Sequence, residues 1–175
     1  YKRNVKLSEN KIKSHIIQKY KKESISDYQK RLSFELTSFK KKDDETLVLE
    51  APESYAVSKL VPTDLANIHI RFHGSHLLGK KILGNRLNLQ LIEEEQREID
   101  RAKFLSAPSE SAVIASSSIF QIPKNISCYP NAAPNSINIK TKESLKKISD
   151  DKYVIYIGRI HDLKGAAWLL SLIHI

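Results

Sequence analysis

The sequence has no methionine and only one cysteine among its 175 residues. A single cysteine rules out a disulfide bond within the chain. Cys128 stands in an alternation of apolar and polar residues, which predicts a packed thiol on a strand rather than a nucleophile. The lack of methionine, even at position 1, is unusual for a complete translation product of this size. We therefore expect the chain to be a fragment of a longer protein.

Long apolar runs and several well-known motifs are also missing. No stretch approaches the ~20 apolar residues of a membrane-spanning helix, and no signal-peptide pattern opens the sequence, so we expect a cytoplasmic protein. There is no Walker-type Gly-Lys-Ser/Thr loop, His-Glu-x-x-His, Cys-x-x-Cys or Gly-x-Ser-x-Gly. These absences argue against a P-loop enzyme, a metal site and a serine hydrolase. The 41% of hydrophobic residues is enough for a globular core.

The positive charge is confined to one end of the chain. Residues 1–42 contain 13 Lys and Arg against 4 Asp and Glu, whereas the other 133 residues contain 16 of each. Such a basic segment is able to bind anionic lipid or nucleic acid, or it is only the solvated face of helices. We expect peripheral contact with an anionic membrane and regard nucleic acid as the weaker of the two partners.

The first half of the chain is predicted to begin with helices and continue with strands. Helices are expected over residues 8–22 and 26–42, the second capped by Ser26 and carrying an apolar stripe of Tyr28, Leu32, Leu36 and Phe39. A buried strand follows over 46–49, and Pro52 is placed to begin a helix that runs through residues 55–61. The next strand, over 68–72, delivers His73-Gly74-Ser75-His76 to the end of the sheet.

The second half alternates helices with strands. A helix over 87–103 is expected to keep Glu93, Glu94, Glu95 and Glu98 in water and Leu91, Ile92, Ile99 and Ala102 inward. A strand over 104–106, a helix over 109–117 and a strand over 126–129 follow, and the polar stretch to Asp151 is typical of a linker. Alternating helices and buried strands predict an α/β fold with a mainly parallel, Rossmann-like sheet.

The stretch from Tyr153 to Gly165 predicts a strand that runs into an anion site. Five apolar residues precede Gly158, which allows a sharp turn, and Arg159 and Lys164 add two cations where α/β sheets bind their ligands. The helix that starts at Gly165 would contribute free N–H groups, so a diphosphate would fit there. The alternative is an ordinary strand, turn and helix with solvated charges.

This stretch resembles the start of the nucleotide-binding domain in retaining glycosyltransferases of family 4, also called group 1. In that family a strand ends in Gly-Arg, and a short loop leads to Lys-Gly. The resemblance implies that Arg159 and Lys164 hold the diphosphate of a sugar nucleotide, and that Gly158 and Gly165 shape the loop. It also implies the GT-B architecture of two facing Rossmann-like domains. No cofactor and no metal are expected, because the cations would balance the diphosphate charge.

Three further pieces resemble the same family in the same order. His73-Gly74 is similar to the His-Gly step in which a histidine approaches the donor sugar, so His73 is the candidate catalytic residue. Residues 97–109 are similar to the family's helix, strand and serine turn, and residues 126–131 to its strand that ends in Pro-Asn. Candidates for acceptor or cleft contacts are Glu50, Glu53, Ser106 and Asn131. The alternatives are that His73 only bonds a carbonyl and that Glu50 and Glu53 are solvated.

The expected organisation is a basic helical segment over 1–45, a partial acceptor-side domain over 46–135, a linker over 136–151 and the start of a donor-binding domain over 152–175. The chain would belong to an enzyme that moves a sugar from a nucleotide diphosphate donor to a saccharide or lipid-linked acceptor. The family's glycine-rich loop and acidic pair have no counterpart in the sequence, so the fragment is expected to be inactive alone. The rival hypotheses are a basic, non-enzymatic module that binds nucleic acid or membrane, and a degenerate remnant.

Overall fold

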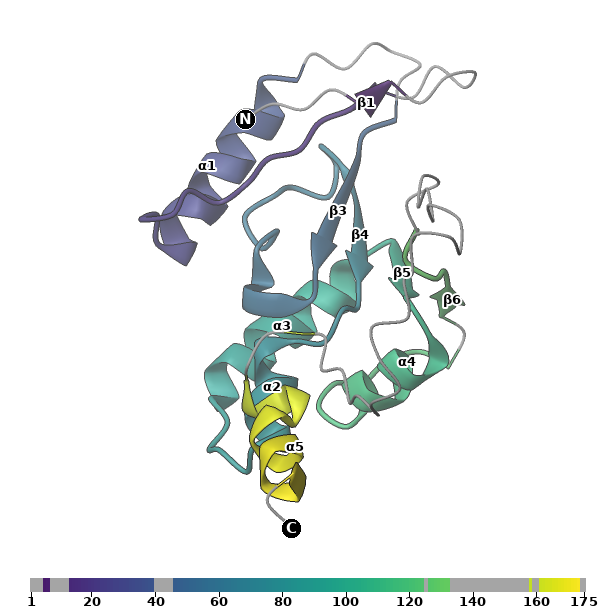
Figure 1. Ribbon diagram of the computed structural model, residues 1–175. Coiled ribbons are helices and arrows are strands. Elements are labelled where there is room, and N and C mark those ends of the chain that lie inside the picture. Colours follow the sequence, from purple (N-terminus) through teal and green to yellow (C-terminus); the bar gives the residue numbers. More distant parts are fainter. Residues whose placement is uncertain are drawn as a thin grey trace, which may run out of the picture.

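The centre of the computed structural model is a sheet of four parallel strands that neighbour one another in chain order, β3-β4-β5-β6 (Figure 1). The structure describes residues 5–6, 13–39, 46–124, 126–132, 158 and 161–173. The strands are β3 (Val48–Pro52), β4 (Asn67–Arg71), β5 (Phe104–Ala107) and β6 (Ser127–Cys128). With helices between the strands, the sheet confirms the expected α/β class with parallel pairing. The linker predicted over 136–151 and the strand predicted over 153–157 lie outside the described residues.

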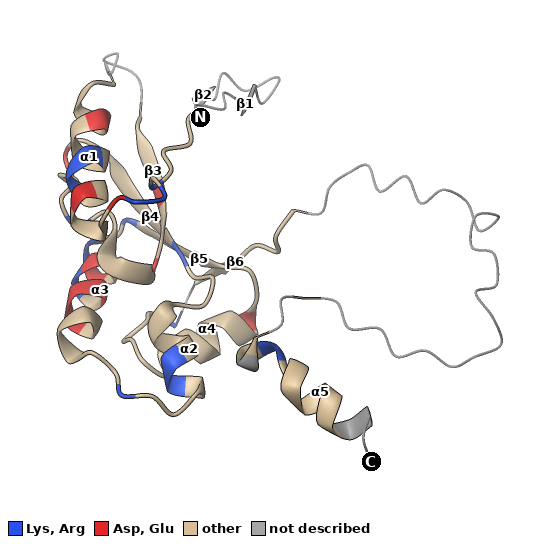
Figure 2. Cartoon of the chain, turned by 60° about the vertical axis from the view of Figure 1, so that its left-hand side comes forward, with Lys and Arg blue, Asp and Glu red and all other residues tan. Residues whose placement is uncertain are grey.

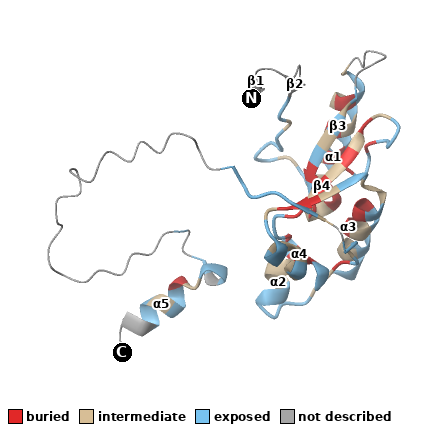
Figure 3. Cartoon of the chain, turned by 90° about the vertical axis from the view of Figure 1, so that its right-hand side faces the viewer, coloured by how far each residue is buried: buried red, intermediate tan, exposed pale blue. Residues whose placement is uncertain are grey.

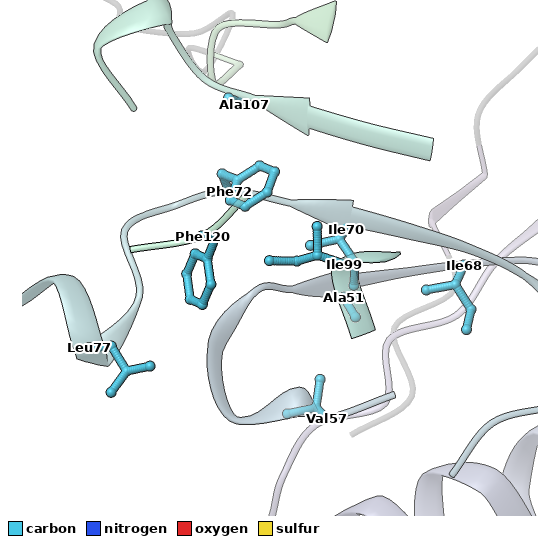
Figure 4. Close-up of a cluster of buried hydrophobic side chains, with 9 residues drawn as sticks. All are labelled: Ala51, Val57, Ile68, Ile70, Phe72, Leu77, Ile99, Ala107 and Phe120. Atoms are coloured by element: carbon cyan, nitrogen blue, oxygen red, sulfur yellow. The ribbon is translucent and has the colours of Figure 1, made fainter. Parts of the chain in front are cut away.

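One face of the sheet is apolar and the other is polar. Ile68 and Ile70 of β4 are buried together with Ala107 of β5, and they form the main core with residues from α3 and the loops (Figure 4). The alternate residues on β4, such as His69 and Arg71, are only half-buried. A strand covered on both faces would be apolar throughout. On β4 the burial instead alternates, just as His69 and Arg71 alternate with Ile68 and Ile70 in the sequence.

Helix α1 (Ile25–Thr37) lies beside β3 (Figure 1). Leu32 and Leu36 are buried against Val61 and Ala66, and each such side chain contributes about 1.5–3 kcal/mol to stability. The helix begins one residue earlier and ends five residues earlier than predicted. Its N-cap is Ser24, whose hydroxyl accepts from the amide of Asp27 at 3.1 Å, rather than Ser26.

The helix predicted over residues 8–22 is wrong where the structure describes it. Lys13–Ser14 is the short strand β2, which pairs antiparallel with β1 (Val5–Lys6), and residues 15–20 have no regular structure. Contacts from α1 explain the difference: Arg31 donates to the carbonyl of Gln18 at 2.7 Å, and the Tyr28 hydroxyl donates to that of Ile17 at 3.0 Å. Carbonyls that would bond within a helix thus bond to side chains instead.

The helix predicted to start at Pro52 is also wrong. Pro52 is the last residue of β3, and only a 3-10 helix, η1 (Ser54–Ala56), follows it. Tyr55 has φ 65° and Ala56 has φ 44°, both in the left-handed region that non-glycine residues rarely adopt. An α-helix cannot continue through these two residues, so the segment turns back toward β4.

Three helices follow β4 and β5, and each begins at a side-chain cap. They are α2 (His76–Ile82), α3 (Leu89–Arg101) and α4 (Glu110–Ser117), capped by Ser75, Asn88 and Ser109. Helix α4 is close to its prediction and α3 is four residues shorter than predicted. Residues 73–76 were expected at the end of the sheet, and no helix was predicted between them and residue 87. Helix α2 is therefore an addition to the prediction.

The last elements are short. β6 has two residues instead of four, and Cys128 is exposed, so the prediction of a packed thiol is wrong. Helix α5 (Ala166–Ile173) has no charged residue and confirms the predicted helix after Gly165 (Figure 2). In the part of the chain with described coordinates, no helix is long and apolar enough to cross a membrane.

Buried residues gather where β3, β4, α1 and α3 meet (Figure 3). A cavity of about 630 Å³ lies in this region, between α1 and the outer edge of β3. Its lining is mostly apolar and includes Ile17, Leu36, Phe39 and Leu49. Glu50, one of the residues expected to contact an acceptor, and Pro52 at the end of β3 also line this cavity, whereas Lys164 and Gly165 do not.

Candidate functional site

The candidate site lies at the carboxyl ends of β3 and β4, where the chain turns out of the sheet. β3 leads directly into Glu53, and β4 leads through Phe72 into His73 and Gly74. The two strands are hydrogen-bonded neighbours with Pro52 opposite Arg71, so the two turns lie side by side. In open parallel sheets this edge is where ligands bind.

A buried carboxylate joins the two turns. Glu53 is 1% exposed, and its oxygens accept from the amide of His73 at 3.0 and 3.1 Å and from the amide of Gly74 at 2.7 Å. Hydrogen bonds to a charged acceptor are stronger than neutral ones, which compensates for the burial of the charge. Glu53 is thus bonded to backbone. The alternative that Glu53 is a solvated carboxylate is therefore wrong, because its hydrogen-bond partners are backbone amides of the protein.

The turn held by Glu53 presents two exposed histidines. Gly74 has φ 96°, a conformation strained for any residue with a side chain, and no atom lies within 4 Å of the place its Cβ would occupy. His73 and His76 on either side of it are exposed. The His76 ring stacks on Tyr55 with 5.3 Å between ring centroids and 23° between planes. The segment after β3 therefore contacts both ends of the turn after β4.

Left-handed residues in that segment are fixed by side chains from two helices. The amide of Gln29 on α1 donates to the carbonyls of Tyr55 and Ala56, both at 3.0 Å. Glu95 on α3 accepts from the amide of Tyr55 at 2.6 Å. Backbone strain of this kind persists only where the surroundings over-determine it, and it is concentrated at functional sites.

Glu95 and Glu98 are buried, which corrects the prediction that both lie in water on α3. Glu95 is 0% exposed and Glu98 is 1% exposed. Glu98 accepts from the amide of Ser58 at 2.5 Å and from the Ser58 hydroxyl, and one oxygen of each glutamate has no partner among the described residues. Burial raises the pKa of each carboxyl to about 7, and the Glu53 charge adds to the rise at Glu95.

A row of polar side chains crosses the other face of the sheet. Glu50 Oε2 lies 3.3 Å from His69 Nδ1, and His69 Nε2 lies 2.8 Å from the hydroxyl oxygen of Ser106. This is the geometry of a carboxylate, histidine and serine triad. Ser106 is only 1% exposed, however, so its hydroxyl has no access to a substrate. The row stabilises the pairing of β3, β4 and β5 rather than supplying a nucleophile.

Arg71 extends the row to the last strand. Its guanidinium donates to the Ser106 hydroxyl at 3.3 Å, to the carbonyl of Tyr129 at 2.6 Å and to the side-chain oxygen of Asn131 at 3.2 Å. Of the four residues expected to contact an acceptor, the structure therefore joins Glu50, Ser106 and Asn131 through His69 and Arg71. It places Glu53 with His73 instead.

The expected diphosphate segment is described in part. Arg159 lies outside the described residues, whereas Gly158 and Lys164 are exposed. Gly165 has φ 67°, and its carbonyl accepts from the amide of Leu169 at 2.9 Å, so it forms the start of α5. Leu163 lies against α2: a Cβ on Gly79 would be 3.2 Å from Leu163 Cδ1. The segment that contains Lys164 thus contacts the helix that begins two residues after Gly74.

Comparisons with protein-family models, with curated proteins and with solved structures found no match. The contacts above therefore carry the functional argument. Among the described residues, no three His, Cys, Asp or Glu lie together as metal ligands would.

Sequence reasoning missed several residues of this region. His69, Arg71 and Gln29 received no role, and Glu95 and Glu98 were placed on the wrong side of α3. One pattern was available for β4: Asn67, His69 and Arg71 alternate with Ile68 and Ile70, which is typical of a strand with one polar face. No pattern in the sequence pairs α3 with the segment after β3, because that contact joins residues 40 positions apart.

Proposed function

We propose that the chain is part of a retaining glycosyltransferase with two Rossmann-like domains of the GT-B kind. The enzyme would transfer a sugar from a nucleotide diphosphate donor to a saccharide or lipid-linked acceptor at the inner face of the membrane. The described part would belong mainly to the acceptor-side domain, and α5 to the start of the donor-binding domain. The parallel sheet and the ordered His73-Gly74 turn at its carboxyl edge support this proposal.

The observation that carries most weight is the contact between Leu163 and Gly79. It brings the segment of Lys164, the proposed diphosphate contact, against α2, and α2 begins directly after the turn that presents His73, the proposed sugar contact. A donor sugar and its diphosphate need both kinds of group within one site. The contact between Leu163 and Gly79 supports such a site, because it joins the segment of Lys164 to the helix that follows His73.

The proposed chemistry uses charge rather than a metal. Negative charge grows on the diphosphate as the bond to the sugar breaks, so Lys164 and Arg159 would stabilise the transition state more than the ground state. Free N–H groups at the start of α5 would add to this stabilisation. His73 would hydrogen-bond a hydroxyl of the donor sugar and fix the ring beside the leaving group.

Titration of the full chain with uridine diphosphate, followed by NMR of the backbone amides, tests the proposed diphosphate site. We expect shifts at Lys164, Gly165 and Ala166, and at least tenfold weaker binding in Lys164→Ala. That loss corresponds to the roughly 1.5–3 kcal/mol of a hydrogen bond to a charged group.

The matched control is Lys124→Ala, which also removes an exposed lysine but lies outside the proposed site. It should bind uridine diphosphate like the unchanged chain. Equal binding by Lys164→Ala and the unchanged chain would overturn the diphosphate site. Equal shifts with inorganic phosphate would show a general anion site without nucleotide recognition, which contradicts the proposed donor.

A further inference from the structure

Glu53 differs from the other buried glutamates in what it binds. Glu95 and Glu98 each leave one oxygen without a partner among the described residues, whereas both oxygens of Glu53 accept hydrogen bonds. Its three bonds come from the amides of two successive residues, His73 and Gly74. Two neighbouring amides that converge on one carboxylate fix the direction in which the chain leaves β4.

That direction decides where the His73 side chain stands. His73 is the first exposed residue after β4, and the left-handed Gly74 follows it immediately. The amides of both residues lie beyond the last strand residue, so sheet pairing does not hold them. Their orientation therefore depends on the carboxylate that they share.

Glu53 is itself held on a rigid base. The residues that follow it are bound by Gln29 from α1 and by Glu95 and Glu98 from α3. The Tyr55 ring lies against His76 at the far end of the turn. A side chain placed on such a base is pre-organised, because few of its neighbours are free to move.

We propose that Glu53 is a positioning residue, which holds His73 in the orientation needed to contact the donor sugar. The inference rests on the proposed function, and it assigns Glu53 to the support of the sugar contact instead of to the acceptor. Replacing the carboxylate with an amide places an NH2 group opposite a backbone N–H, which removes one or more of the three bonds.

The experiment compares Glu53→Gln with Glu93→Gln in the full chain. Glu93 has the same chemistry, and its side chain is exposed on α3, far along the chain from the turn. In the unchanged chain we expect low-field amide resonances for residues 73 and 74, since both donate to a charged acceptor. Glu53→Gln should move both resonances upfield, and Glu93→Gln should leave them in place.

A second readout separates positioning from simple structural support. Titrations with uridine diphosphate and with uridine diphosphate glucose measure how much the sugar adds to binding. Glu53→Gln and His73→Ala should each weaken the binding of the glucose donor by about fivefold to tenfold, the value of one hydrogen bond, and leave uridine diphosphate binding unchanged. The double variant should lose no more than His73→Ala alone, because both changes remove the same contact.

The outcomes distinguish the two proposals. If the unchanged chain shows no uridine diphosphate shifts at Gly165, the proposed function fails and the positioning role fails with it. If uridine diphosphate binds but the losses from Glu53→Gln and His73→Ala multiply in the double variant, Glu53 does not act through His73. If Glu53→Gln unfolds the chain, Glu53→Asp takes its place, because aspartate keeps the charge but is shorter by one methylene group. The binding of the glucose donor to Glu53→Asp, to His73→Ala and to their double variant then tests whether residue 53 acts through His73.

Discussion

Single residues at the carboxyl edge show how burial changes the chemistry of a side chain. Glu53, Glu95 and Glu98 are all buried around the segment that follows β3. Glu53 has a full set of donors, whereas Glu95 and Glu98 titrate at about 7 because the surroundings disfavour their charge. These two carboxyls make the stability of the fold depend on pH.

Stability should fall as pH rises from about 4.5 to about 7. In this range the unfolded chain releases protons at the ordinary glutamate pKa of 4.5, but the folded chain retains them on Glu95 and Glu98 up to about 7. For each carboxyl, a rise from 4.5 to about 7 corresponds to roughly 3 kcal/mol of stability, which is present below pH 4.5 and lost as pH rises through 7. Urea unfolding at a series of pH values measures the slope.

Glu95→Gln should reduce this slope, because a glutamine retains the oxygen that accepts from Tyr55 and does not titrate. Glu93→Gln is the matched control on the exposed side of α3 and should keep the full slope. A slope that Glu95→Gln leaves unchanged would contradict the assignment. Below pH 4.5 an opposite trend is expected, since Arg31 lowers the pKa of Glu23 to about 2 and that ion pair is lost as pH falls.

The burial of these glutamates could not be predicted from the sequence. On a helix they stand beside Glu93 and Glu94, and four acidic residues in six positions normally mark a face in water. They are buried because they accept hydrogen bonds from backbone amides of the segment after β3, Glu95 from Tyr55 and Glu98 from Ser58. These hydrogen bonds join residues 40 positions apart in the chain, so no local sequence pattern reveals them.

At the scale of elements, predictions succeeded where the cause was local. The helix predicted over 109–117 is observed as α4, with Ser109 as its cap, and the strand pattern around residues 68–72 located β4 to within a residue. The predictions failed where a side chain from a distant part of the sequence determines the local structure. Arg31 and Tyr28 keep residues 15–20 out of a helix, and Gln29 and Glu95 hold the left-handed turn after Pro52.

The left-handed turn gives a direct test at this scale. Ala56 has φ 44°, a conformation that costs an alanine about 1 kcal/mol relative to glycine. Ala56→Gly should therefore be neutral or stabilising, even though the methyl group is buried. Ala115→Gly inside α4 is the control and should destabilise by about 1 kcal/mol, the helix cost of glycine.

Thermal unfolding of the two variants at one pH measures the difference. If Ala56→Gly destabilises as much as Ala115→Gly, residue 56 does not adopt the left-handed conformation. In that case the account of why no α-helix follows β3 would be wrong.

At the scale of the whole molecule, the alternation of helices and strands was enough to predict a parallel α/β sheet. It was not enough to predict that one face of the sheet is polar, because the row from Glu50 to Asn131 joins residues of four separate segments. The organisation into two domains stays a prediction, since the linker and the strand after it lie outside the described residues.

The uneven distribution of charge predicts attraction to anionic membranes. The net charge of +9 comes from residues 1–42, and only part of that segment is described. Co-sedimentation with vesicles that contain phosphatidylserine should exceed that with neutral vesicles and should weaken as salt rises, because exposed charges are screened. Equal binding to both kinds of vesicle would contradict an electrostatic contact.

The outer edge of β3 has a consequence for many copies of the chain together. Among the described residues β3 pairs only with β4, so its other edge offers backbone donors and acceptors without a partner strand. An open edge is a template on which another chain can add a strand, and this is the usual first step of aggregation. Pro52 removes one donor near the end of this edge, which limits such growth but does not prevent it. The concentration at which the protein begins to aggregate therefore depends on what covers this edge.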